Sequence, residues 1–344
     1  MCQAEPEASG HARTRWGYGY EEFTPGEPVE LSGYVDRTTL SEGVADPVAV
    51  RAACVEVESE PIVIAVADVL GLPVEWSHNL REEICRVTGL DTDHVLLAAT
   101  HNHAAPTVTR ILGCVEARPE TLRRLEEAFL PSVEQAVERT TPVEFSYGEA
   151  ITEGIIYHRR RRMPDGIINM EVPGPGEDHG TSSIDPKIRV LIARDTSGAV
   201  KGCLVCFGTH GTVLGPKNLM ISGDLPGRLC QVLDRQFGHH GSVFLSGASA
   251  DVNPLAFRGS LTQLEAVSEL LAHYVQQAIG SASPIELSRP RSRLAELEVP
   301  LFPVERSKVD EFLRHPPERI TSTHSTEAFS NTKALREWAE ITLS

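Results

Sequence analysis

The sequence predicts an α/β protein with a mixed β-sheet core flanked by helices and with functional loops at the carboxyl ends of strands. Short apolar runs rich in β-branched residues, such as 61–68 and 94–100, alternate with amphipathic helical segments. Histidines and glycine-rich turns follow directly after such runs, where α/β folds place their sites. The 344 residues are 41% hydrophobic and 23% charged, which excludes disordered, collagen-like and coiled-coil proteins.

The N-terminal half alternates strands and helices. Residues 1–16 are polar, and we expect a loose segment there. A strand that enters a turn is predicted over 16–25. The next elements, in order, are a strand over 61–68, a helix over 74–88, a strand over 94–100 and a helix over 120–140.

The second half repeats this alternation. Strands over 187–194 and 199–209 form a hairpin, because residues 195–198 have turn chemistry. The later elements are a helix over 225–237, a strand over 242–246, a helix over 261–280, a strand-like stretch over 294–303 and two helical pieces, the last over 334–342. A long surface loop is expected over 165–184, and no internal repeat is apparent in the sequence. We therefore divide the chain into the loose segment 1–16, one α/β domain over 17–285 and a C-terminal extension of that domain over 286–344.

Charge and cysteine usage restrict the partners and the compartment. The chain has 32 basic and 48 acidic residues, a net charge of 32 − 48 = −16, which repels nucleic acids and anionic lipid headgroups. No run approaches the roughly 20 apolar residues of a membrane span, and the first residues lack a secretory pattern. Seven cysteines, an odd number without regular spacing, predict reduced thiols and a cytoplasmic protein. Cys203 and Cys206 have the CxxC spacing, but their apolar run favours two core thiols over a redox or zinc pair.

Histidines at strand ends are the sharpest local feature. His101 and His103 follow the 94–100 run two residues apart, and in an extended chain side chains at that spacing point to the same side. His210 repeats the order of apolar strand, threonine and histidine. Histidine is the commonest nitrogen ligand of zinc, so two such strand ends suit a three-ligand zinc site with an open position for water. The pair alone also fits a loop histidine with an unrelated neighbour.

Three aspartates stand at comparable places. Asp68 ends the 61–68 run, Asp224 lies in a glycine-rich loop before a helix, and Asp251 follows the 242–246 strand. Aspartate at such positions usually caps a helix or orders a turn, but it also serves as a metal ligand or as a partner of a ligating histidine. The sequence leaves both roles open.

Four consecutive arginines, residues 159–162, interrupt the acidic background. Such a cluster is normally a solvated face or an anion patch, although one arginine could turn inward to hold an oxyanion or a substrate oxygen. Four other histidines lie in polar loops without a strand before them, and we expect these on the surface; they are His158, His179, His239 and His240.

Taken together, these stretches resemble the catalytic domain of the neutral/alkaline (non-lysosomal) ceramidase family of zinc-dependent amidases. The resemblance rests on an ordered set of motifs over about residues 17–255. They are Gly17-Tyr-Gly with Thr24-Pro25, Leu31-Ser-Gly-Tyr34 with Arg37, Val66-Ala-Asp68-Val-Leu, Thr100-His-Asn-His-Ala-Ala-Pro106, Arg159-Arg160 with Asp165-Gly166, Ile184-Asp-Pro186 with Val190-Leu, His210-Gly-Thr-Val-Leu, Ile221-Ser-Gly-Asp-Leu-Pro-Gly227 and Gly247-Ala-Ser-Ala-Asp-Val-Asn-Pro254.

The resemblance implies a cofactor, a reaction and four site residues. His101 and His210 are implied as ligands of Zn2+, while His103 and Arg159 are implied to line the site and to polarise or position the amide. The implied reaction is hydrolysis of an N-acyl bond, in ceramides to a fatty acid and a sphingoid base, by metal-activated water. Arg159, His103 or a tyrosine would stabilise the oxyanion and assist proton transfer. The implied partner is a small or lipid amide substrate.

The C-terminal part departs from the family pattern. In the family a glutamate and a tyrosine further along the chain complete the zinc site, but residues 255–344 contain no Pro-Gly-Glu-like turn and no tyrosine after Tyr274. Two explanations stay open: a shortened member that completes its site with Asp68, Asp224 or Asp251, or a truncated, inactive homologue whose unfinished sheet edge predicts self-association.

The alternative enzyme class is a metal-dependent hydrolase of an ester or lactone. HxH strand ends occur in several such folds. The HxHxDH signature of metallo-β-lactamases is missing, because Ala105 and Pro106 occupy its last two positions.

Overall fold

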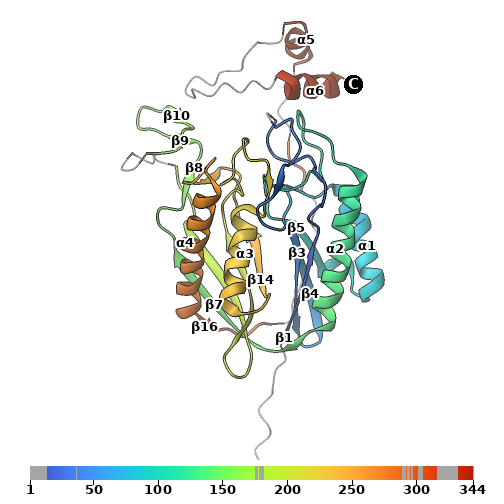
Figure 1. Ribbon diagram of the computed structural model, residues 1–344, viewed down its shortest axis with the longest axis vertical. Coiled ribbons are helices and arrows are strands. Elements are labelled where there is room, and N and C mark those ends of the chain that lie inside the picture. Colours follow the sequence, from blue (N-terminus) through green and yellow to red (C-terminus); the bar gives the residue numbers. More distant parts are fainter. Residues whose placement is uncertain are drawn as a thin grey trace, which may run out of the picture.

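Two β-sheets stack face to face in the middle of the molecule, and helices cover the outer face of each (Figure 1). The computed structural model describes residues 14–35, 37–174, 177, 182–288, 292, 295, 297–300, 305–315 and 332–343. Helices α1 (Val74–Thr88) and α2 (Pro119–Glu138) pack on one sheet, and α3 (Asp224–Phe237) and α4 (Leu261–Gly280) pack on the other. The predicted α/β class with a mixed sheet core and flanking helices is confirmed, but the core contains two sheets.

The two sheets have the same topology. The first has the order β5-β4-β3-β1-β6 and the second the order β14-β12-β11-β7-β16. In each sheet three long strands form an antiparallel meander and one further strand adds in parallel, β5 on β4 and β14 on β12. A helix joins the strands of each parallel pair, α1 in the first half and α3 in the second. The chain is therefore a structural duplication, which the sequence does not reveal.

The strand bounds complete this description. The first sheet contains β1 (Thr14–Glu22), β3 (Ala49–Val57), β4 (Glu60–Ala67), β5 (Val95–Ala99) and β6 (Thr141–Pro142). The second contains β7 (Glu144–Ile151), β11 (Lys187–Arg194), β12 (Val200–Phe207), β14 (Ser242–Ser246) and β16 (Ser283–Pro284). Short pairs join β2 (Gly43–Val44) to β13 (Met220–Ile221), β8 (Ile156–His158) to β15 (Val252–Pro254) and β9 (Arg161–Arg162) to β10 (Ile168–Asn169). A 3-10 turn covers Thr92–His94, and α5 (Arg306–Arg314) and α6 (Thr332–Leu343) follow the second sheet.

Glycines let a helix lie directly on each sheet. A Cβ on Gly17 of β1 would stand 1.8 Å from the Ala136 carbonyl oxygen of α2. The corresponding strand of the other half repeats this device, since a Cβ on Gly148 of β7 would stand 1.9 Å from the Ala278 carbonyl oxygen of α4. Any larger side chain would push the helix away from its sheet.

Most of the predicted elements occur, and two central strands were missed. The helices over 74–88 and 261–280 have the predicted bounds, and Ser260 begins the second with a capping box to Gln263. The missed strands β3 and β7 are inner strands of their sheets. Strand β1 begins at Thr14, inside the expected loose segment, and residues 1–13 lie outside the described part. Of the strand-like stretch 294–303, the described residues 295 and 297–300 have no regular structure.

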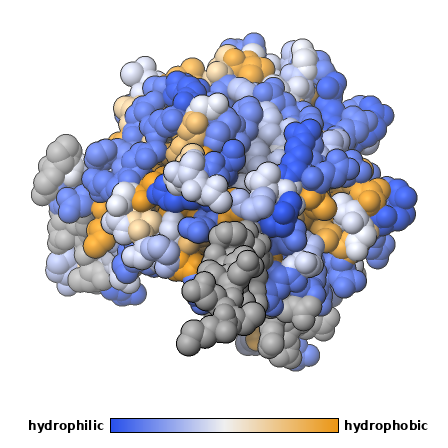
Figure 2. Space-filling model, turned by 90° about the horizontal axis from the view of Figure 1, so that it is seen from below, coloured by the Kyte–Doolittle hydropathy of each residue, from blue (hydrophilic) through white to orange (hydrophobic). Residues whose placement is uncertain are grey.

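Polar surface and reduced thiols agree with the sequence analysis. Cys203 is buried and Cys206 partly buried, and both are free thiols, as are the other cysteines that the structure describes. None of the described helices combines the length and the apolar character needed to cross a bilayer. Figure 2 shows the lower end of the molecule, where polar side chains predominate and apolar ones are scattered among them.

Candidate metal centre

The loops after β5 and β12 meet at one end of the paired sheets. His101 lies two residues beyond β5, and His210 lies three residues beyond β12. A bridge between Asn102 and Gly211 joins the two loops, and the His103 amide donates to the Gly211 carbonyl at 3.0 Å. The loops come from different sheets, so the candidate site lies at the junction of the two halves.

Three imidazoles converge there. The Nε2 atoms of His101 and His103 are 3.3 Å apart, and the ring centroid of His210 lies 4.8 Å from that of His101 and 5.7 Å from that of His103. The three rings each contribute one nitrogen atom, and these three atoms all lie within 4.8 Å of one another. The structure therefore brings together the three histidines that the sequence analysis singled out.

The backbone at the histidine pair is not extended as predicted. His101 has a φ of 58°, in the left-handed region that non-glycine residues rarely adopt. The expectation that His101 and His103 point to one side of an extended segment was wrong. The two rings nevertheless lie together, as that expectation implied. The left-handed turn, and not strand geometry, makes the two rings face each other.

Backbone carbonyls orient all three rings. In each ring Nδ1 lies against a carbonyl oxygen, which can only accept a hydrogen bond, so Nδ1 carries the proton and Nε2 keeps its lone pair. The contacts are His101 to Leu70 at 2.9 Å, His103 to Gly33 at 3.1 Å and His210 to Val252 at 3.1 Å. This is the arrangement in which outer hydrogen bonds fix the tautomer of a metal-ligating histidine.

Burial keeps these imidazoles neutral. It lowers the pKa of His103 to about 3, with the neighbouring His101 and His210 contributing, and it lowers the pKa of His101 as well. Burial, then His101 and Arg159, lower the pKa of His210 to about 4. Three neutral rings that turn lone pairs toward one another repel unless a cation lies between them. The donor set thus fits a divalent metal, and an all-nitrogen set with few ligands suits zinc.

Arg159 stands beside this cluster. It follows β8, and its amide donates to the Asp251 carbonyl at 2.8 Å. Its side chain is half-buried, and its charge contributes to the lowered pKa of both His101 and His210. Within the arginine run the fully buried member is Arg161, whose Nη2 donates to the Glu171 carbonyl at 3.0 Å. The inward-turned arginine expected from the sequence is therefore Arg161, and Arg159 is the one near the imidazoles.

The aspartates have structural roles. Asp68 is buried and pairs with Arg51 at 2.5 Å. Asp224 accepts hydrogen bonds from the amides of Val213, Leu214 and Leu225 at 3.0, 2.9 and 2.7 Å, and burial raises its pKa to about 6. Neither carboxylate belongs to the histidine group. Of the two roles that the sequence left open for Asp68 and Asp224, the structure shows the structural one.

Asp251 lies against a histidine outside the cluster. Its carboxylate is 3.0 Å from Nε2 of His158, whose side chain is only 15% exposed. His158 is thus a partly buried residue in contact with the Asp251 carboxylate, and not the surface residue that the sequence suggested. His239 and His240 are exposed as expected, and His179 lies outside the described residues.

Two residues that support the site were missed by sequence reasoning. Asn102 is fully buried, its Nδ2 donates to the Ser222 carbonyl at 2.7 Å, and its Oδ1 accepts from the Ala104 amide at 2.8 Å. The Arg37 guanidinium donates to the His103 carbonyl at 2.9 Å. Both lie within motifs quoted above, which was the available signal for them.

Comparisons with known proteins agree with the motif resemblance. No protein-family model matches the chain. Neutral ceramidase of Pseudomonas aeruginosa is 28% identical over 142 residues, 40% of this chain and 20% of the relative. Neutral ceramidase of Mycobacterium tuberculosis is 28% identical over 210 residues, 56% of this chain and 31% of the relative. The chain thus spans less than a third of the length of these relatives.

Solved structures share the fold. The crystal structure of neutral ceramidase from Pseudomonas aeruginosa superposes with a TM-score of 0.68 at 18% identity, and covers 78% of this chain and 45% of that one. A structure described as ceramidase complexed with C2 gives a TM-score of 0.66 at 19% identity, with 78% and 44% covered. The resemblance to neutral ceramidases and the fold class are confirmed.

Proposed function

We propose that this chain is a zinc-dependent hydrolase that cleaves an N-acyl amide bond. The observation that carries the proposal is the cluster of His101, His103 and His210, three neutral imidazoles whose Nδ1 atoms are held by carbonyls and whose Nε2 lone pairs converge. Three histidines with a free fourth position are the ligand set of a catalytic zinc site.

The site residues would have different roles in the reaction. A bound zinc supplies Lewis acidity and a water acidic enough to act as a nucleophile near neutral pH. His101 and His210 would hold the metal, and His103 would either add a third nitrogen or transfer a proton at its Nε2. The Arg159 guanidinium would donate to the oxygen that gains negative charge as the carbonyl is attacked.

The substrate class comes from the similarity to neutral ceramidases. That similarity favours a lipid amide, and it supports an amide more directly than an ester or lactone. The chain covers 45% of the crystal structure, and cleavage of ceramide itself is the most specific part of the proposal.

Metal analysis tests the site. We expect about one zinc per chain after purification without added metal, and its loss in His101→Ala and His210→Ala. The matched control is His273→Ala, which removes an exposed imidazole on α4. Zinc content equal to the wild type in both cluster variants would disprove the metal assignment.

Matched substrates test the reaction. A short-chain ceramide, its ester analogue and a simple N-acyl anilide should be offered to zinc-loaded protein, with the amides hydrolysed and Arg159→Ala impaired. Faster cleavage of the ester would favour the esterase alternative. Zinc binding without turnover of any of the three would identify an inactive homologue.

A further inference from the structure

A second cleft lies far from the histidine cluster. It has a volume of about 500 Å3 and opens near the start of β12, whereas His210 lies beyond the end of that strand. Since β12 has eight residues, the two places are separated by roughly 25 Å of strand. Nine residues line the cleft: Trp16, Tyr18, Tyr20, Gln135, Arg139, Thr141, Lys201, His239 and His240.

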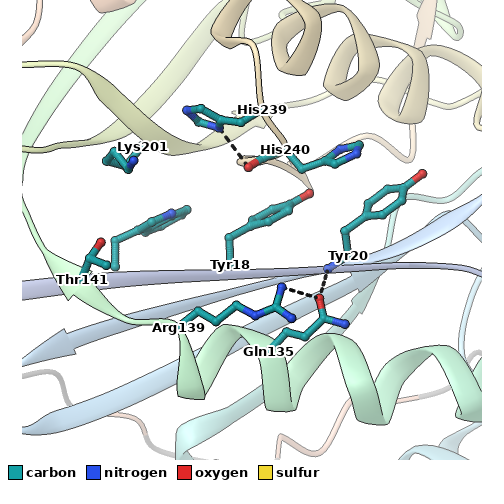
Figure 3. Close-up of a pocket in the computed structure, with 9 residues that line it drawn as sticks. Tyr18, Tyr20, Gln135, Arg139, Thr141, Lys201, His239 and His240 are labelled. Carbon is teal, nitrogen blue, oxygen red and sulfur yellow. Dashed lines mark hydrogen bonds between the residues drawn. The ribbon is translucent and has the colours of Figure 1, made fainter.

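One wall is a row of aromatic rings. Trp16, Tyr18 and Tyr20 alternate along β1 with the glycines that face α2, so all three point to the same side of the strand. Figure 3 shows Tyr18 and Tyr20 rising together from β1 toward the loop that carries His239 and His240. Neighbouring rings of such a row are about 6.6 Å apart along the strand, which is close to twice the thickness of an aromatic ring.

The opposite wall is held in place. The His240 ring stacks on Tyr20 with centroids 4.3 Å apart and planes at 11°. The Asp234 carboxylate fixes that wall, because it lies 3.0 Å from Nδ1 of His240 and accepts from the Ser242 amide at 3.0 Å. Nε2 of His239 lies 2.9 Å from the Val200 carbonyl oxygen. The rings therefore stand in fixed positions.

The cleft is cationic in a strongly acidic protein. Arg139 and Lys201 line it, and none of its lining residues is an aspartate or glutamate, although the chain carries a net charge of −16. In the described part of the chain, neither Arg139 nor Lys201 belongs to an ion pair. Figure 3 places Lys201 above β1, on the side of the tyrosine rings, and Arg139 below the strand.

We infer that this cleft binds a planar aromatic anion. Trp16 is only 3% exposed, so a flat ring gains its stacking contact from the partly exposed tyrosines, and an attached phosphate or carboxylate is attracted by the guanidinium and the ammonium group. An uncharged aliphatic chain would leave both cations without a partner, and a cationic ligand would meet like charge. The cleft volume suits a ligand of nucleotide size. The inference does not depend on the function proposed for the histidine cluster.

Calorimetric titration of the full chain tests this, with AMP and 2-naphthoate as phosphate and carboxylate probes. Adenosine and inorganic phosphate serve as the two halves of AMP. The titrations are repeated in EDTA, so that phosphate bound at a metal contributes nothing. We expect at least one probe to bind with a Kd below about 1 mM, and for AMP the halves to bind at least about tenfold more weakly.

Charge-removing variants locate the site. Lys201→Gln and Arg139→Gln should each weaken the probe about fivefold, because each removes one partly exposed cation near the anion. Arg123→Gln removes the same charge from an exposed position of α2 and should change nothing. Failure of both probes to bind, adenosine binding as tightly as AMP, or equal affinities in all three variants would overturn the inference.

Discussion

Gly33 lies against the ring of His103, and its replacement by alanine tests how the histidine cluster is held. The residue has a φ of 95°, and an added Cβ would stand 2.3 Å from Nδ1 and 2.6 Å from Cγ of His103. The ring cannot keep its position at such distances. The variant therefore loses the hydrogen bond between His103 Nδ1 and the Gly33 carbonyl oxygen, which are 3.1 Å apart in the wild type.

The expected cost has two parts. The left-handed backbone costs about 1 kcal/mol with an alanine, and the lost hydrogen bond costs about 1 kcal/mol more. Loss of an orienting hydrogen bond at a ligating histidine typically weakens metal affinity by about 10- to 100-fold. Gly33→Ala should thus be only mildly destabilised but clearly impaired in zinc binding.

A control variant at a second glycine, Gly154, separates the cost of backbone strain from the effect of displacing the His103 ring. Gly154 has a φ of 67°, and no heavy atom lies within 4 Å of its added Cβ, so Gly154→Ala carries the backbone strain alone. Urea unfolding gives the stability of both variants, and competition with a chromophoric chelator gives their zinc affinity. If Gly33→Ala held zinc as tightly as Gly154→Ala, His103 would have no part in metal binding and the reasoning would be refuted.

Three further predictions concern charge. Burial lowers the pKa of His210 to about 4 from 6.5, so on acidification the unfolded chain takes up the proton first. Between pH 7 and pH 5 the His210 imidazole should then account for about 2 kcal/mol of the stability that the metal-free fold loses, so His210→Asn should lose about 2 kcal/mol less than the wild type in urea unfolding with EDTA; identical pH slopes would contradict this. Asp68→Ala should lower the free energy of unfolding by about 3–5 kcal/mol, because it leaves the buried Arg51 unpaired. The double variant that combines Arg51→Met with Asp68→Leu should lose less stability; equal losses in the two proteins would argue against a desolvated ion pair. Arg159→Ala should lower kcat about 10²- to 10³-fold at unchanged zinc content, while Arg160→Ala, an exposed neighbour, should keep full activity.

The elements that could be predicted are those with strong local patterns. The helices over 74–88 and 261–280 have amphipathic spacing, and the strands over 61–68 and 187–194 are apolar and β-branched. The missed strand β3 contains Arg51 at a fully internal position, which only the distant Asp68 makes tolerable. A residue whose partner is supplied by another strand gives no local indication of burial, so the inner strand was not recognised.

The sequence identified the histidines that form the cluster, but not the groups that hold them in place. His101 and His210 could be found because each follows an apolar strand. The carbonyls that orient the rings belong to Leu70, Gly33 and Val252, between 31 and 70 residues away along the chain. Their contribution is made by backbone atoms, which carry no residue type for a pattern to detect.

The structural duplication bears on whether the metal site is incomplete. Strands β4 and β12 correspond in the two halves, and they lead into Asp68 and His210 respectively. The segment after β4 contains the buried ion pair of Asp68, and the segment after β12 contributes the His210 imidazole to the junction. The junction thus obtains one histidine from the second half and a pair from the first.

Three nitrogens are already the number that a catalytic zinc takes from the protein, with the fourth position left for water. A glutamate and a tyrosine from a further segment would change the coordination and reactivity of the metal, but zinc binding itself does not require them. Metal content and turnover should therefore be measured separately. If zinc is bound and amides are not cleaved, the missing contribution is to catalysis, and the histidine cluster is a complete binding site.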